Sequence, residues 1–242
     1  KQKTAYEIMP SLVGSEMCIR DSSYRLRKME ERELRVQTGQ LYKFSEKLLN
    51  WVISLVGLII LIPLFIVISL AIKLTSKGPI LFKQERLKSR NKNFLFLKFR
   101  TMYVNYDHKI HEEYVENLIK DKVRKGRVFK LKKDPRVTKI GSFLRKTSLD
   151  ELPQFLNVLK GDMSVVGPRP PIPYEVEKYK EWHKMRLDCK QGITGMWQVF
   201  GRSRLPFDES VFLDIWYCMN KSIFLDLYLI INTIPSMLKG AY

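Results

Sequence analysis

Two adjacent acids near the middle of the chain, Asp150 and Glu151, follow a cluster of cations. Arg145 and Lys146 come just before them, and Arg136 lies further upstream. A carboxylate can act as a nucleophile, and carboxylates can hold a divalent metal that works on a phosphate ester. Asp150 and Glu151 are therefore candidates for catalysis and for metal binding, and Arg145 and Arg136 are candidates for phosphate binding.

Further cations can reach the same phosphate. Arg169 stands in a stiff, proline-rich loop at residues 167–171, which can hold one guanidinium for bidentate phosphate contact. Arg86, Lys98 and Arg100 lie on two short aromatic-rich segments and can line a phosphate groove. The sequence leaves open whether these three are ligands or solvated charges on strands.

The acid pair also has a purely structural interpretation. Ser148 and Glu151 have the spacing of a capping box, and acids near the start of a helix favour it electrostatically. Apolar residues at helical spacing follow, and Gly161 can end that helix. This stretch alone leaves both interpretations open, and the surrounding cations together with Arg169 favour catalysis.

Residues 48–72 form an uncharged apolar segment, which would anchor the site at a membrane. About 25 residues of this kind can cross a bilayer once as a helix. Pro63 removes a backbone hydrogen bond slightly past the middle and predicts a bend. The segment is flanked on both sides by lysines, which are Lys43, Lys47, Lys73, Lys77 and Lys83.

Two placements of this segment compete. The positive-inside rule assigns both basic flanks to the cytosol, whereas a single crossing would export one of them. Each half of the bent helix, about 12 to 15 residues, reaches roughly 20 Å, which is enough for one leaflet. We therefore favour a proline-kinked helix at residues 41–75 that enters the membrane and returns.

Charge and cysteine content narrow the class of protein. The chain has 242 residues and a formal charge of +18, which predicts polyanionic partners. No nucleic-acid reading helix or stacking platform is recognisable, so a nucleic-acid partner is not expected. The three cysteines, Cys18, Cys189 and Cys218, have neither disulfide nor zinc spacing, which favours a reducing compartment.

The remaining sequence supplies the elements around the site. Residues 80–86 and 94–100 predict a β-hairpin, and helices are expected at 103–127, 174–190 and 207–220. Residues 223–231 suit a helix resting on a membrane surface. Arg202 is a further candidate for substrate contact.

The motifs in this order are similar to those of the bacterial sugar transferase family, the monotopic polyprenyl-phosphate phosphoglycosyl transferases. The matching residues are 98–102, 134–138, 144–154, 157–170, 192–199, 201–203 and 239–242. The resemblance covers roughly residues 43–242, and its Asp-Glu and Gly-Pro-Arg-Pro segments are specific.

The resemblance implies a compact, mostly helical α/β domain at residues 76–242, with amphipathic helices on the cytosolic leaflet of the bacterial inner membrane. It implies transfer of a sugar-1-phosphate from a UDP-sugar to undecaprenyl phosphate, with Mg²⁺ at the site and UMP released. Asp150 corresponds to the nucleophile and Glu151 to its partner, while Arg145 and Arg169 correspond to phosphate ligands. Assembly into a homo-oligomer is compatible with this class.

Some residues depart from the family pattern. Ile62 replaces the usual serine before the membrane proline, and Lys88 and Asn91 replace hairpin glycines. A catalytically silent scaffold that binds anionic lipid or nucleotide-sugar is the alternative to an enzyme. Residues 1–40 are an uncertain segment, because residues 11–21 resemble translated adapter sequence.

Overall fold

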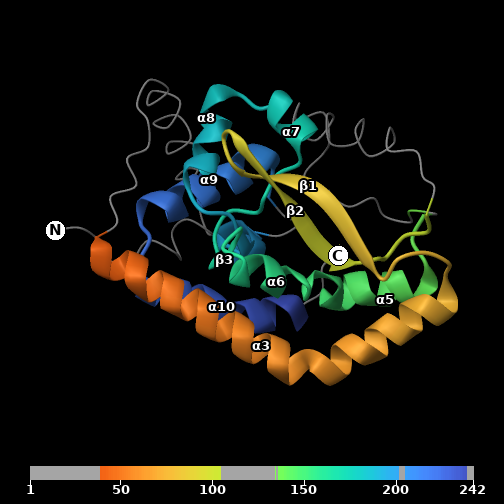
Figure 1. The fold of residues 1–242 in the computed structure, drawn as a ribbon. Helices are drawn as coiled ribbons and strands as arrows, with labels where there is room; N and C mark the ends of the chain where they lie inside the picture. The colour runs from red at the N-terminus through yellow and green to blue at the C-terminus, as the bar shows by residue number, and fades with distance from the viewer. Residues whose placement is uncertain (1–38, 105–133, 135, 202–204, 239–242) are drawn as a thin grey trace.

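The computed structural model describes residues 39–104, 134, 136–201 and 205–238 (Figure 1). The uncertain N-terminal segment and the helix expected at 103–127 therefore lie almost wholly outside the described residues. The described part is mostly helical with two small two-stranded sheets. This agrees with the expected fold class in its coarse form.

The apolar segment forms one long helix, α3 (Gln40–Thr75), which continues through Pro63. In Figure 1 the ribbon of α3 changes direction near its middle. Only 11% of its most apolar stretch is buried against the rest of the chain. A core helix of a water-soluble domain would be covered on most sides, so α3 does not have that role here.

The expected hairpin is present as β1 (Leu81–Ser89) and β2 (Lys92–Phe99), paired antiparallel. Aromatic side chains are buried on both of its faces, because Phe96 packs in the main core and Phe99 in a second cluster with α3 and α5, and each is 1% exposed. Asn157 of α6 (Gln154–Leu159) bonds the Leu95 carbonyl and the Leu97 amide at 2.7 and 3.0 Å. The hairpin is thereby fixed against the segment that carries the acids.

The acid pair lies between α5 (Lys139–Thr147) and α6, in the short 3₁₀ helix η1 (Leu149–Glu151). Ser148 has φ 58° and ψ 16° and is the one non-glycine residue with positive φ among those described. Its side chain makes no capping hydrogen bond, so the predicted capping box is wrong. Gly161 has φ 77° just after α6, which agrees with the predicted helix end.

The loop that carries Arg169 follows a parallel strand pair that the sequence did not predict. β3 (Ser164–Val166) pairs with β4 (Gly192–Thr194), and the Gly167 amide donates to the Thr194 carbonyl at 2.8 Å. A Cβ on Gly192 would lie 2.1 Å from the Gly167 nitrogen, so glycine is required for this close approach.

The predicted helix at 174–190 is instead three short helices. These are α7 (Pro173–Glu177), α8 (Glu181–Lys184) and the 3₁₀ helix η2 (Met185–Asp188). After the π-helical turn η3 (Trp197–Gly201), α9 (Phe207–Met219) is buried on most sides instead of being clearly amphipathic.

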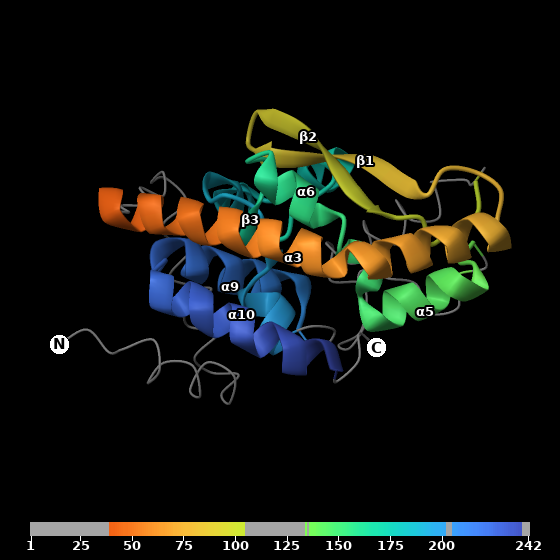
Figure 2. The same ribbon diagram turned by 60° about the horizontal axis from the view of Figure 1, so that its bottom comes forward.

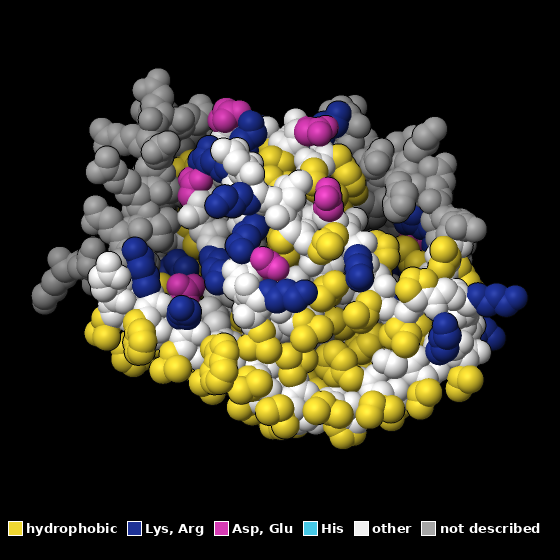
Figure 3. All heavy atoms as spheres, in the orientation of Figure 1, with side chains coloured by type: hydrophobic (Ala, Val, Ile, Leu, Met, Phe, Trp, Pro, Cys, Tyr) yellow, Lys and Arg dark blue, Asp and Glu magenta, His cyan; other side chains and the backbone are white. Residues whose placement is uncertain are grey.

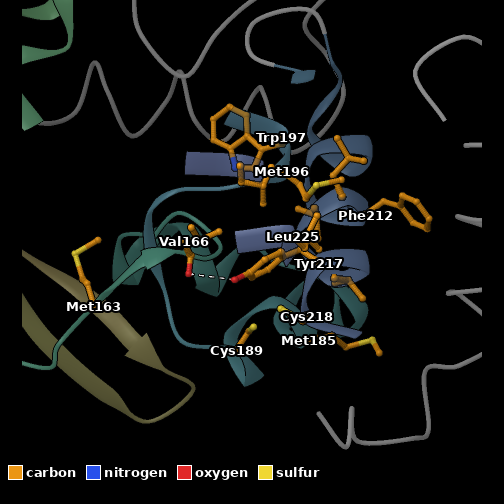
Figure 4. Packing of buried hydrophobic residues seen from close by; sticks show 14 of the residues in the cluster. Met163, Val166, Met185, Cys189, Met196, Trp197, Phe212, Tyr217, Cys218 and Leu225 are labelled. Carbon is orange, nitrogen blue, oxygen red and sulfur yellow. Dashed lines mark hydrogen bonds between the residues drawn. The ribbon is translucent and has the colours of Figure 1, made fainter. Parts of the chain in front are cut away.

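The main hydrophobic core surrounds α9 (Figure 4). Tyr217 reaches across it, and its hydroxyl donates to the Val166 carbonyl at 3.3 Å. The same hydroxyl donates to Asp226 at 2.6 Å. The core therefore contacts the end of β3, which leads into the loop that carries Arg169.

One face of the molecule is apolar. In Figure 2, α10 (Ile223–Leu238) and α5 lie alongside α3 on that face, and Figure 3 shows hydrophobic side chains along this edge with cations above it. Its exposed large side chains include Trp51, Ile59, Ile60, Ile66, Val67, Phe143, Phe224, Leu227, Ile231 and Ile234. A continuous exposed apolar patch on neighbouring helices is typical of a membrane or protein contact.

Candidate active site

A cavity of about 610 Å³ opens between the hairpin, α5 and the Arg169 loop. Asp150 and Glu151 are not among its lining residues, but Arg169 lines it and donates to Glu151. Cavities of roughly 300–1,000 Å³ hold most small-molecule ligands. Among the described residues that line it, one is acidic, Glu175, and eight are basic. The basic residues are Lys83, Arg86, Lys98, Arg100, Arg136, Arg145, Arg169 and Arg186. Such a cavity suits a ligand with several negative charges.

The two acids have different surroundings. Asp150 is buried at 2% exposure. Glu151 accepts a hydrogen bond from Arg169 Nη1 at 3.0 Å, and both side chains are partly exposed. Burial favours a lower pKa for Arg169, but the negative charge of Glu151 outweighs burial, so the pKa is raised above its usual value. The fold thus brings both predicted acids beside the predicted phosphate-binding arginine.

Lys98 joins this cluster from β2. Its ammonium lies 4.9 Å from the centre of the Phe82 ring. Burial lowers the pKa of Lys98 to about 7; the charge of Asp150 opposes this shift, and three neighbouring arginines add to it. The ammonium therefore changes its charge near neutral pH, and a bound anion would favour its protonated form.

The other predicted phosphate ligands have different positions. Arg145 is in the last turn of α5 and lines the cavity beside Lys98. Arg136 lines it too, but its guanidinium donates two hydrogen bonds to Asp134 at 2.8 Å each. Burial favours a higher pKa for Asp134, but the hydrogen bonds from Arg136 outweigh burial, so the pKa is lowered below its usual value. Arg202 lies outside the described residues.

Arg100 lines the cavity with its nitrogens directed to the backbone. Nη2 donates to the Ser76 carbonyl at 2.8 Å and to the Ser76 hydroxyl at 2.9 Å, and Nη1 donates to the Lys77 carbonyl. These contacts fix the chain just after α3. The geometry gives Arg100 a structural task that the sequence did not indicate.

The donor set at the acid pair is compatible with Mg²⁺. Magnesium prefers oxygen ligands and is usually held by one or two carboxylates together with substrate phosphates and water. Asp150 and Glu151 supply two adjacent carboxylates next to a cavity that suits phosphates. In the described part of the chain, no group of three or more His, Cys, Asp or Glu side chains is placed to hold a metal alone.

Sequence reasoning missed Arg186 and Glu175 as residues of this cavity. Both fall in the segment that was expected to be one continuous helix. No proline or glycine occurs within residues 174–190, so the sequence carries no local signal for a break in this segment. Tyr174, Tyr179 and Trp197 line the same region and give it an aromatic part.

Comparison with known sequences identifies the family of this chain. Residues 41–240 match the sequence profile of the family described as bacterial sugar transferase. The galactosyl transferase CpsE of Streptococcus agalactiae serotype III (strain NEM316) is 41% identical over 223 residues, which cover 89% of this chain and 48% of that protein.

Two further relatives have similar identity. The undecaprenyl-phosphate galactose phosphotransferase of Salmonella typhimurium (strain LT2) is 38% identical, over 97% of this chain and 50% of that protein. The exopolysaccharide production protein ExoY of Sinorhizobium fredii (strain NBRC 101917 / NGR234) is 38% identical, over 82% of this chain and 88% of that protein. The chain thus spans about half the length of the first two relatives, and it belongs to the bacterial sugar transferase family.

Proposed function

We propose that this protein transfers a sugar-1-phosphate from a UDP-sugar to undecaprenyl phosphate and so initiates the assembly of a surface glycan. The observation that carries the proposal is the cavity lined by eight Lys and Arg side chains beside Asp150 and Glu151. Relatives named as a galactosyl transferase and as an undecaprenyl-phosphate galactose phosphotransferase support the substrate class.

Asp150 is the nucleophile in this proposal. Its carboxylate attacks the phosphorus that bears the sugar, and the bond from that phosphorus to the UMP oxygen breaks, so that UMP leaves. An oxygen of undecaprenyl phosphate then attacks the same phosphorus and displaces Asp150. Two anionic substrates can thereby use one site in turn. Because Asp150 is 2% exposed, we expect side chains around it to shift when the donor binds.

The cations make this attack feasible. Arg145, Lys98 and Arg169 neutralise the diphosphate that a carboxylate must approach. Mg²⁺ bound by Asp150, Glu151 and substrate oxygens would supply further neutralisation of charge. The ion pair between Arg169 and Glu151 orients the guanidinium before substrate binds.

The apolar face supports a membrane location. We propose that α3 enters the cytosolic leaflet of the bacterial inner membrane and returns, with its bend near Pro63 deepest in the bilayer. Exposed apolar residues of α10, including Phe224 and Ile231, would lie in the interface beside it. The cavity would then open where a lipid phosphate and a soluble nucleotide-sugar can both reach it.

The test is UMP release in detergent micelles with undecaprenyl phosphate, Mg²⁺ and a panel of UDP-sugars. The proposal predicts UMP release with at least one donor, and Asp150→Asn should abolish it. Failure of every donor to release UMP, with UDP-sugar binding intact, would instead support a catalytically silent scaffold. The panel would also identify the sugar.

A further inference from the structure

The proline-rich loop at residues 168–171 is held by its carbonyl groups. Three of its four residues are prolines, which have no backbone N–H to donate. The Pro168 carbonyl accepts from the Gly192 amide at 2.8 Å, and the Pro171 carbonyl accepts from the Leu87 amide at 3.0 Å. The two carbonyls between them accept from arginine side chains.

These arginines come from two elements that contact each other, β1 and η2. Arg86 of β1 donates to the Pro170 carbonyl at 2.5 Å, and Arg186 of η2 donates to the Arg169 carbonyl at 3.2 Å. Arg86 and Arg186 are 6% and 5% exposed, so water competes little for these bonds. Each of the four loop carbonyls thus has a donor, which fixes the backbone from which Arg169 projects.

Arg186 is itself fixed by α9. The Nη2 group that bonds the loop also donates to the carboxylate of Asp214, and Nη1 donates to the Tyr179 hydroxyl at 3.4 Å. Burial would lower the pKa of Arg186, but the charge of Asp214 raises it. Both terminal amino groups of Arg186 therefore donate within the protein, although the side chain lines the cavity.

We infer that Arg186, held by Asp214, is a positioning residue that acts through Arg169, and that it is not a ligand of the substrate phosphates. The inference rests on the proposed function, in which Arg169 binds the diphosphate. A continuous set of contacts then runs from α9 through Arg186 to the backbone of Arg169. Lysine cannot replace Arg186 here, because a single ammonium lacks the planar fork that bonds two acceptors and a hydroxyl.

A double-mutant cycle tests this assignment, with UDP binding to the full chain in detergent measured by calorimetry. Arg186→Lys should weaken UDP binding about 10-fold, which is the scale of the loss when a residue that orients a binding side chain is replaced. In the Arg169→Ala background the same substitution should cost less than about 2-fold, because the residue through which it acts is gone. Equal cost in both backgrounds would mean direct phosphate contact and would overturn the inference, as would no cost in the unmodified chain.

Two further variants separate positioning from general destabilisation. Asp214→Asn should reproduce the loss of UDP affinity and the non-additivity with Arg169→Ala. Asp208→Asn is the matched control, since Asp208 is on the same helix and pairs with His183 at 2.9 Å and Lys180 at 3.2 Å, neither of which is seen to hydrogen-bond the loop in the described part of the chain. It should lower the thermal midpoint while leaving UDP affinity within about 2-fold. Loss of affinity with Asp208→Asn equal to that with Asp214→Asn would overturn the inference.

The experiment also separates this inference from the proposed function. A non-additive cycle together with no UMP release from any donor would contradict the transfer reaction alone. UMP release together with an additive cycle would contradict the positioning role alone. Absence of UDP binding to the unmodified chain would contradict both.

Discussion

At the scale of single residues, Arg100 and Arg145 line the same cavity in different surroundings. Arg100 donates to Ser76 and Lys77 at the end of α3. Both arginines have a buried Nε with no hydrogen-bond partner among the described residues, but only Arg100 has Nη groups that donate to the described backbone. Sequence reasoning predicts the same role for both, because the type of a side chain does not reveal which acceptors the fold brings to it.

Substitution of these two arginines should therefore have different effects. Arg100→Gln should lower the free energy of unfolding by about 1–3 kcal/mol, since it removes charged hydrogen bonds to the backbone. Arg145→Gln should lower kcat/KM about 10²- to 10³-fold with little change in stability, as expected for loss of one electrostatic clamp. Thermal unfolding measures the change in stability, and UMP-release kinetics measure the change in kcat/KM. A loss of stability in Arg145→Gln together with a loss of kcat/KM alone in Arg100→Gln would contradict this account.

The lowered pKa of Lys98 predicts a pH dependence of donor binding. A lysine whose pKa falls from 10.5 to about 7 is mostly neutral above pH 8, so its attraction for a diphosphate is strongest below pH 7 and is lost as pH rises. The diphosphate of a UDP-sugar keeps its charge over this range. We expect the affinity for a UDP-sugar to fall between pH 6.5 and pH 8.5, about 10-fold if one clamp is lost.

Lys98→Arg is the control for this prediction, because a guanidinium stays charged throughout this range. The variant should bind the UDP-sugar with nearly constant affinity from pH 6.5 to pH 8.5. Equal pH dependence in the variant and the unmodified chain would assign the titration to another group.

At the scale of elements, the sequence was sufficient to predict the helices and strands that depend on a local pattern of residues. The apolar run predicts α3, and the two short aromatic-rich segments predict the β1–β2 hairpin. The parallel β3–β4 pair could not be predicted in this way, since each strand has three residues and their pairing depends on close contact between Gly167 and Gly192. Burial of α9 likewise depends on distant segments that no local pattern reveals.

Polar residues of α3 connect this helix to β3. Asn50 is 7% exposed and bonds the Ser164 hydroxyl at 2.7 Å and the Val165 amide at 2.8 Å. The Ser164 hydroxyl in turn donates to Glu46 at 3.1 Å, and Lys221 donates to the same carboxylate at 3.0 Å. The apolar helix is thus joined to the strand that leads to Arg169.

Removing this connection should destabilise the protein. Asn50→Ala leaves the buried Val165 amide without its partner, which costs about 1–3 kcal/mol. Thr75→Ala is the control, because its exposed hydroxyl bonds only its own helix at Ala71 and Ile72, and a surface change of this kind stays within about 0.5 kcal/mol. Thermal unfolding in detergent compares the two, and equal midpoints would contradict a structural role for Asn50.

At the scale of the whole molecule, an apolar edge is separated from the surface cations above it (Figure 3), and eight Lys and Arg side chains line the cavity. The sequence indicated both features through the uncharged segment and the +18 charge. It also favoured a surface helix at residues 223–231, which are part of α10, but it did not indicate that α5 would lie beside α3 on that face (Figure 2), because that placement depends on tertiary packing.

Re-entry of α3 predicts that both of its ends are on the cytosolic side. Single cysteines introduced as Lys43→Cys and Lys77→Cys, in a background without Cys18, Cys189 and Cys218, report this. An impermeant maleimide should label both in inverted membrane vesicles and neither in intact spheroplasts. Labelling of the two positions from opposite sides would mean that α3 crosses the bilayer.

The most direct test of the account is a search for a covalent adduct on Asp150. The full chain is incubated with Mg²⁺ and the UDP-sugar that supports transfer, without lipid acceptor, and is then quenched and digested for mass spectrometry. The account predicts a glycosyl phosphate on the peptide that contains Asp150, formed together with UMP, released by undecaprenyl phosphate and absent in Asp150→Asn. Rapid turnover with acceptor, but no adduct at Asp150 under the same conditions without it, would contradict the account.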